Sequence, residues 1–245
     1  MTCPPPAQLS SLELLGFGDC GWGATLLWGF GNSILIAIGA YALGFLIGVT
    51  GAFGKLYGGP VAKDLWSVYT TLVRAVPELV LMLILYYAVP AGLNQLLIAA
   101  GYERIDLPQF ITGVVVLAFV QGAYQTEVLR GAILAVPHGQ IEAARAMGMA
   151  PGQVARRVIF PQMTANAVPG LGNLWLNATK DTALLAVIGF SELTKATYQA
   201  SATTKAFFTF YPAAMAMYLL ISLISMFAFA RIEKWARKGQ RDARG

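Results

Sequence analysis

The sequence predicts an all-α integral membrane protein with five transmembrane helices. Only 12% of its 245 residues are charged, whereas about 25% are charged in an average soluble domain. The charges also leave long uncharged stretches, at 20–54, 79–102, 107–126, 158–179 and 206–230. None of these stretches alternates apolar and polar residues with a period of two, so the strands of an outer-membrane barrel are excluded.

Each uncharged stretch is long enough to cross a bilayer, because about 20 helical residues span a hydrocarbon core of about 30 Å. We therefore expect a transmembrane domain over residues 24–231. Its helices are expected at about 24–51, 65–89, 108–130, 160–180 and 206–231. The uncharged stretch at 182–191 is too short to cross, and it predicts a re-entrant or interfacial piece.

The Lys and Arg residues predict the orientation. Five crossings put the two termini on opposite sides of the membrane. With the C-terminus inside, twelve of the 17 Lys and Arg residues are cytoplasmic, four lie on the other side, and Arg74 falls within a span. Residues 1–23 then form a periplasmic segment, and 232–245 form a basic cytoplasmic tail. We interpret this tail as an anchor on anionic lipid rather than a nucleic-acid site.

Several kinds of site are missing from the sequence. The two cysteines, Cys3 and Cys20, fit neither a metal-ligand spacing nor a disulfide framework, and no zinc motif or nucleophile elbow is present. The phosphate-binding pattern G-x-x-x-x-G-K-[ST] is also absent. We therefore expect no cofactor in this chain and no enzymatic activity, and any ATP hydrolysis would belong to another polypeptide.

One predicted cytoplasmic loop, residues 131–160, is much longer than a turn between two helices requires. Its composition predicts two short helices, at 140–147 and 152–158, bent at Gly148. Apolar residues, including Met149 and Ala150, would lie near the tip of this projection. Such a tip suits a contact with another protein, although a helical hairpin lying on the membrane surface fits the composition equally well.

The same loop resembles the EAA loop of ABC-importer permeases. Glu142-Ala143-Ala144, three residues, Gly148, nine residues and then Val158-Ile159-Phe160-Pro161 follow the pattern E-A-A-x3-G-x9-I-x-L-P, with Val and Phe in place of Ile and Leu. The resemblance implies short coupling helices that dock on an ATPase subunit. Gly148 would supply the bend, and Glu142 would stabilise the loop by bonding to backbone or to an arginine. The implied coupling residues are Glu142, Ala143, Ala144, Gly148, Met149 and Ala150.

Two other segments extend the resemblance to most of the chain. Residues 70–83 are similar to the R-G-x-P-x-L segment of the polar amino acid permeases, and 177–184 are similar to their K-D-T-S-L segment. The group transports histidine, arginine, lysine, ornithine, glutamine and opines, and its histidine-permease Q subunits are the most similar. The resemblance implies the type I ABC-importer permease fold in the bacterial inner membrane. It also implies a sister permease subunit, two ATPase subunits that bind ATP and Mg, and a periplasmic substrate-binding protein. The two permease subunits would form a heterodimer, although a homodimer is possible.

Two charged residues of the second predicted helix, Arg74 and Glu78, would lie near the middle of the bilayer. A charge there costs roughly 2.5–3.5 kcal/mol, so it faces protein or water and is paired. Their spacing of four places both on one helix face, and Pro77 between them predicts a kink. Either the two residues contact the charged groups of an amino-acid substrate, or they form a structural ion pair.

Polar residues also occur in the third and fourth predicted helices. Asn166, Asn173 and Asn177 share one face, which indicates either hydrogen bonding between tightly packed helices or the wall of a translocation path. Gln121 and Tyr124 of the third helix raise the same alternatives. Glu127 and Arg130 fit an interfacial ion pair. The implied substrate-pathway residues are Arg74, Glu78, Gln121, Tyr124, Asn173 and Asn177.

The expected function is the permease subunit of an ABC importer that moves a polar or cationic amino acid, or an opine, by alternating access. Two other functions compete with it. A secondary transporter driven by an ion gradient would normally show internal repeats, and the sequence shows none. A membrane anchor without a transport role would not require polar residues at mid-membrane.

Overall fold

The computed structural model describes residues 9–238, and every regular element in that range is helical. The prediction of an all-α chain is therefore confirmed. The helices are α1 (Ser11–Leu14), α2 (Gly23–Tyr57), α3 (Pro60–Ala75), α4 (Glu78–Ala99), α5 (Gln109–Leu134), α6 (His138–Ala146), α7 (Pro151–Val154), α8 (Phe160–Asp181), α9 (Leu193–Thr204) and α10 (Phe207–Ala236). A π-helical turn, Ala155–Ile159, joins α7 to α8, and a 3-10 turn, Thr182–Ala186, follows α8.

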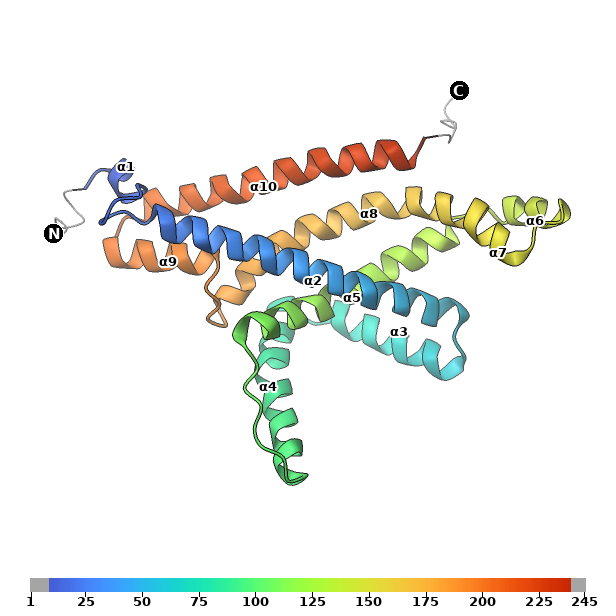
Figure 1. Ribbon diagram of the computed structural model, residues 1–245, viewed down its shortest axis with the longest axis horizontal. Coiled ribbons are helices and arrows are strands. Elements are labelled where there is room, and N and C mark those ends of the chain that lie inside the picture. Colours follow the sequence, from blue (N-terminus) through green and yellow to red (C-terminus); the bar gives the residue numbers. More distant parts are fainter. Residues whose placement is uncertain (1–8, 239–245) are drawn as a thin grey trace.

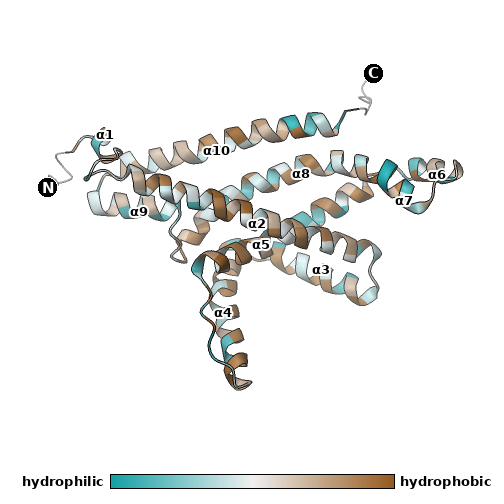
Figure 2. Ribbon diagram, viewed as in Figure 1, coloured by the Kyte–Doolittle hydropathy of each residue, from teal (hydrophilic) through white to brown (hydrophobic). Residues whose placement is uncertain are grey.

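Four of the described helices, α2, α4, α5 and α10, are long and apolar enough to cross a membrane, judged by length and composition. The helix α8 has 22 residues, so it is also long enough to cross. It contains three asparagines, however, and its mean hydropathy is lower than that of the other four helices. Figure 2 shows apolar residues along α2, α4 and α5, whereas hydrophilic residues gather at α7 and the adjoining turn.

The predicted helix at 65–89 is wrong, because the chain breaks there into α3 and α4. Val76 is extended (φ −93°, ψ 141°), as expected for a residue that precedes a proline, and Pro77 has no N–H to continue the helix. The sequence predicted only a kink at this proline. After the break α4 projects away from the other helices (Figure 1), and only 6% of its most apolar 18 residues are buried.

The core forms where α2 crosses α5, and its close approach depends on glycine. A Cβ atom at Gly48 of α2 would lie 2.8 Å from the Cβ atom of Gln125, closer than two carbon atoms pack. Around this crossing Ile36, Leu117 and Val120 are almost fully buried. The hydroxyl of Tyr69 in α3 donates to the carbonyl of Phe119 (2.6 Å), so α3 is fixed to the same core.

The helix α9 was not predicted. The apolar runs of the sequence predict only a re-entrant or interfacial piece at 182–191, whereas α9 is rich in threonine and alanine. Its N-cap is Glu192, which is fully buried and accepts hydrogen bonds from the backbone N–H groups of Thr194 (2.9 Å) and Lys195 (2.8 Å). The hydroxyl of Tyr218 in α10 donates to the same carboxylate (3.1 Å), so the buried cap connects α9 to α10.

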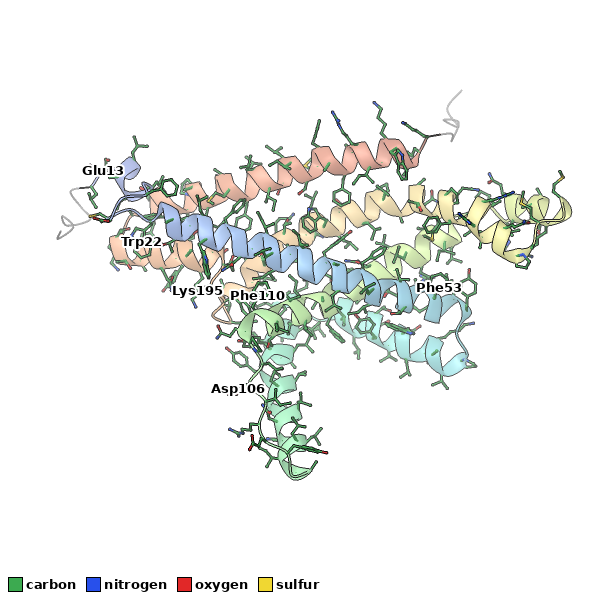
Figure 3. All side chains as sticks on the ribbon, in the orientation of Figure 1. Glu13, Trp22, Phe53, Asp106, Phe110 and Lys195 are labelled. Carbon is green, nitrogen blue, oxygen red and sulfur yellow. The ribbon has the colours of Figure 1, made fainter. Side chains whose placement is uncertain are left out.

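The N-terminal end of the described chain is compact. Ser10 caps α1 and donates from its backbone N–H and its hydroxyl to Glu13, which lowers the pKa of that carboxyl. Cys20, between α1 and α2, is disulfide-bonded, so the expectation that the cysteines take part in no disulfide is wrong, because their spacing in the sequence carries no sign of the bond. In Figure 3 Glu13, Trp22 and Lys195 lie at one end of the molecule, opposite the end that carries α6 and α7. Parts of the predicted segment 1–23 and of the basic tail, residues 1–8 and 239–245, lie outside the described residues.

Candidate functional site

The segment between α5 and α8 (residues 135–159, hereafter the coupling segment) is organised around Gly148. The N–H of Gly148 donates to the carbonyl of Arg145 (2.9 Å), and the N–H of Met149 donates to that of Ala144 (3.2 Å). These two bonds form a Schellman motif at the end of α6. Gly148 has φ +79°, a left-handed conformation that side chains disfavour. The bend therefore depends on the backbone of one residue.

The second of the two predicted short helices does not stand alone. Residues 152–158 were expected to form a separate helix, but α7 continues through the π-helical turn into α8. Pro161 explains the turn, because a proline in a continuous helix removes one hydrogen bond and clashes with the carbonyl four residues earlier. In the wider π turn the N–H of Phe160 donates to the carbonyl of Ala155 instead.

The tip of the coupling segment presents apolar side chains outward. Met147 is 83% exposed, Ala143 and Ala150 are exposed, and Met149 is half-buried. Ala144 is buried, with 7% exposed. The two alanines of the EAA pattern therefore differ: one packs beneath the segment, and the other lies on its surface.

Glu142 does not stabilise the coupling segment in the expected way. Its side chain is exposed, and within residues 9–238 it makes no hydrogen bond or ion pair. The tie between this segment and α8 is made by other side chains, because the amide of Gln162 donates to the side-chain oxygen of Gln140. Sequence reasoning missed this pair, since nothing in the spacing of two surface glutamines marks it.

A second group of side chains meets at the break between α3 and α4. We call this group the polar cluster: Arg74, Glu78, Gln121, Tyr124 and Asp181. The guanidinium carbon of Arg74 lies 5.9 Å from the centre of the Tyr124 ring, within the range of a cation–π contact. The carboxyls of Glu78 and Asp181 lie within electrostatic range of the Tyr124 hydroxyl. Three regions distant in the sequence therefore place charges of both signs around one tyrosine.

Gln121 and Asp181 connect α5 to the end of α8. The side-chain nitrogen of Gln121 donates to Asp181 Oδ2 (3.0 Å), while the side-chain oxygen of the same buried glutamine has no hydrogen-bond partner within the described chain. Asp181 was not predicted as a site residue. The signal for it was present, because it lies in the K-D-T segment at the edge of an uncharged stretch.

Arg74 and Glu78 do not form the ion pair that one interpretation expected. In the part of the chain that the structure describes, the ion pairs are Lys55–Glu127, Arg130–Glu127 and Arg237–Glu233. A spacing of four brings side chains together only within a continuous helix, and the break at Val76 removes that geometry. Both charged groups instead lie beside Tyr124.

The three asparagines of α8 share one face, and that face is exposed. Asn166, Asn173 and Asn177 are exposed, and their amides make no hydrogen bond within residues 9–238. The close contacts of α8 are made through its glycines, because Gly172 approaches the Phe229 ring of α10 and Gly170 approaches Val128 of α5. The asparagines therefore do not join α8 to another helix of this chain.

The predicted pair of Glu127 and Arg130 is confirmed, with Arg130 Nη2 at 2.8 Å from Glu127 Oε2. A third member was missed: the ammonium of Lys55 lies 2.5 Å from Glu127 Oε1 and donates to the Thr70 hydroxyl (2.9 Å). This network fixes α2, α3 and α5 together. The described residues contain no group of three or more His, Cys, Asp or Glu side chains that could hold a metal ion.

The chain is similar to known membrane transport proteins along most of its length. The family model for inner membrane components of binding-protein-dependent transport systems matches residues 40–238. The chain is 41% identical over 232 residues to the nopaline transport system permease protein NocQ of Agrobacterium fabrum, covering 94% of this chain and 98% of that protein. It is 40% identical over 208 residues to the histidine/lysine/arginine/ornithine permease protein HisQ of Escherichia coli, covering 82% and 91%.

Solved structures show the same fold. An amino acid ABC transporter crystallised with histidines matches with a TM-score of 0.75 and 30% identity, over 87% of this chain and 94% of that chain. An inward-facing MetNI methionine ABC transporter matches with a TM-score of 0.66 and 18% identity, over 87% and 97%. The chain belongs to the family of binding-protein-dependent transport system inner membrane components, and it is the permease subunit of an ABC importer rather than an enzyme.

Proposed function

We propose that this permease imports a cationic amino acid or an opine, and that the polar cluster contacts it. The observation that carries the proposal is the meeting of two carboxyls, one guanidinium and a tyrosine ring at the break between α3 and α4. An amino acid with a basic side chain carries charges of both signs, and each needs a partner when water is excluded. The relatives named for nopaline, octopine, histidine, lysine, arginine and ornithine support this class.

Each cluster residue is assigned a contact in this proposal. Glu78 and Asp181 receive the positive group of the substrate, and Arg74 receives its carboxylate. Tyr124 offers its ring to the cation, while Gln121 orients Asp181 through the hydrogen bond already described. Asn173 and Asn177 form the wall along which the substrate passes.

The exposed asparagines also support a permease pair. Amide groups facing lipid without hydrogen-bond partners are unfavourable, so we propose that a sister permease subunit and a water-filled path cover this face. We propose a heterodimer, because the resemblance implies one, with a homodimer as the alternative. The full assembly adds two ATPase subunits, which bind ATP and Mg, and a periplasmic substrate-binding protein.

We propose five crossings, made by α2, by α3 and α4 together, by α5, by α8 and by α10. The N-terminus is then periplasmic, and the coupling segment and the C-terminus are cytoplasmic. The disulfide at Cys20 supports this orientation, because disulfides persist in the periplasm and not in the reducing cytoplasm. In this orientation the coupling segment contacts the ATPase through the residues expected from the EAA pattern: Glu142, Ala143, Ala144, Gly148, Met149 and Ala150.

In the proposed mechanism, ATP closes the ATPase dimer and draws the two coupling segments together, so that the permease pair opens outward. Such coupling requires that the nucleotide and the substrate bias the same two-state element. We propose that this element is the continuous connection from the Gly148 bend through the π turn into α8. It joins the coupling segment directly to the helix that carries the asparagine face.

Two measurements test the proposal. First, the chain is purified from native membranes in mild detergent, and a bound P-loop ATPase is sought; its absence would contradict the assignment to an importer. Second, the assembly is reconstituted with its binding protein, and ATP hydrolysis is measured with arginine, lysine, ornithine, histidine, glutamine and an opine. Stimulation by the cationic members supports the proposal, and stimulation by glutamine alone contradicts the role of the polar cluster.

A further inference from the structure

An apolar groove of about 700 Å³ lies between α2, α8 and α10. Its lining includes Tyr41, Leu46, Val168, Leu171, Phe229 and Ile232. The one hydroxyl among them is already satisfied, since Tyr41 donates to the carbonyl of Leu171 (2.8 Å). The groove therefore offers a ligand apolar contacts and no unpaired polar side chain.

The groove is on the side of α8 opposite the asparagine face. Asn177 follows Val168 by nine residues, which is about 2.5 helical turns and places it half a turn away around the helix. If the asparagine face borders the sister subunit and the substrate path, the groove faces the lipid. This step rests on the proposed function, because it is that function which places the asparagine face against the sister subunit and the substrate path.

Two of the helices that line the groove, α8 and α10, carry basic residues toward the end that we assign to the cytoplasmic side. Arg156 and Arg157 lie in the π turn before α8, and Arg231, Lys234 and Arg237 lie near the end of α10; all five are exposed. Among the described residues of these two regions, 155–159 and 225–238, Glu233 is the one carboxylate, and it is paired with Arg237 (3.0 Å). The net charge there is positive, and anionic phospholipids of the cytoplasmic leaflet are attracted to such a surface.

We propose that the groove is a binding site for an anionic phospholipid, whose acyl chain lies between α2 and α10 and whose phosphate headgroup lies among these basic residues. In Figure 1 α10 runs apart from α2 along this stretch, with α8 bridging the two. The acyl chain then fills the groove between α2 and α10, which the side chains of this protein do not fill.

The test uses the complete transporter, exchanged into detergent with equimolar dioleoyl phosphatidylglycerol and dioleoyl phosphatidylcholine and examined by native mass spectrometry. We expect retained phosphatidylglycerol. We expect Leu46→Trp, at the exposed mouth of the groove, to reduce retention about ten-fold, because displacing even two methylene groups from apolar contact accounts for that factor. The matched control is Leu220→Trp, on an exposed position of α10 outside the groove lining, and it should retain the lipid.

A second variant tests the headgroup without altering the groove. The double substitution Arg231→Gln and Lys234→Gln should remove the preference for phosphatidylglycerol over phosphatidylcholine. Equal lipid retention by the wild type and Leu46→Trp would overturn the proposal, as would an unchanged preference in the double variant. A cross-link from Leu46→Cys to the sister subunit would also overturn it, because protein would then occupy the groove. Uptake assays on the same variants, reconstituted in proteoliposomes, report the proposed function separately, so a failure of one proposal can be told from a failure of the other.

Discussion

The coupling segment and the polar cluster are built in different ways. The coupling segment is local in sequence: its bend depends on one glycine with φ +79° and on two backbone hydrogen bonds, which join residues three and five positions apart. The polar cluster draws its side chains from α5, from the end of α8 and from the two sides of the α3–α4 break. In the coupling segment, the backbone conformation of neighbouring residues fixes the shape. In the polar cluster, the packing of helices that are distant in the sequence fixes the positions of the charges.

The largest effect is expected at the bend. Gly148→Val places a branched side chain at a left-handed φ, and such strain of about 1–3 kcal/mol corresponds to about 5- to 150-fold in an equilibrium. We expect substrate-stimulated ATP hydrolysis by the reconstituted assembly to fall by that factor. Gly152→Ala, in the exposed α7 with open space at its Cβ position, is the matched control and should remain active. Normal coupling in Gly148→Val would show that the segment does not depend on its backbone.

Neutralising the cluster should have the next largest effect. Asp181→Asn and Glu78→Gln each remove a carboxylate assigned to the substrate cation, and we expect lysine uptake to fall about ten-fold in each, since a hydrogen bond to a charged group contributes about 1.5–3 kcal/mol. Glu103→Gln, on the exposed connection between α4 and α5, is the control. The decisive comparison is with glutamine uptake in the same proteoliposomes. An equal loss for both amino acids would make the cluster structural.

A smaller change is expected at Glu142. Since this side chain has no partner within residues 9–238, Glu142→Gln should leave the melting temperature of the assembly unchanged. Coupling should fall about two- to five-fold, as expected for the loss of one exposed charge contact with the ATPase, worth about 0.2–1 kcal/mol. A lower melting temperature with intact coupling would be the opposite result, and it would assign the residue to the fold of the segment.

The smallest effect concerns the pair that ties α6 to α8. Gln140→Ala removes one exposed hydrogen bond, worth about 0.5–1.5 kcal/mol, so we expect coupling to fall about two-fold. Gln162→Ala should give the same value, and the double variant should add nothing further, because the two residues share one interaction. Strictly additive losses, measured as ATP hydrolysis rates, would mean that the pair does not act as a unit.

The contrast between local and distributed features also explains which parts of the structure could be predicted from the sequence. The bend at Gly148 and the pair of Glu127 and Arg130 were found because each depends on residues close together in the chain. The approximate positions of α2, α5, α8 and α10 followed from the uncharged stretches, since lipid imposes that pattern on every crossing helix. Those four helices differ from the expected bounds only near their ends.

The features that were missed depend on tertiary packing. No spacing brings Asp181 to Gln121 or Lys55 to Glu127, since these pairs form only after α2, α5 and α8 have packed. The break at Val76 was underestimated because a proline inside a membrane helix is compatible with either a kink or a full interruption. The short polar helix α9 carries no apolar run, so a search for membrane spans passes over it.

The projecting helix α4 has a consequence for how this protein accumulates in cells. Since its own chain leaves most residues of α4 exposed or only half-buried, we expect a newly made copy to finish burying this helix only when it meets a neighbour. Its lifetime before assembly is then governed by how soon a neighbour arrives, and membrane quality-control proteases compete for the unassembled form. The abundance of the subunit should accordingly follow the supply of its companions rather than its own rate of synthesis.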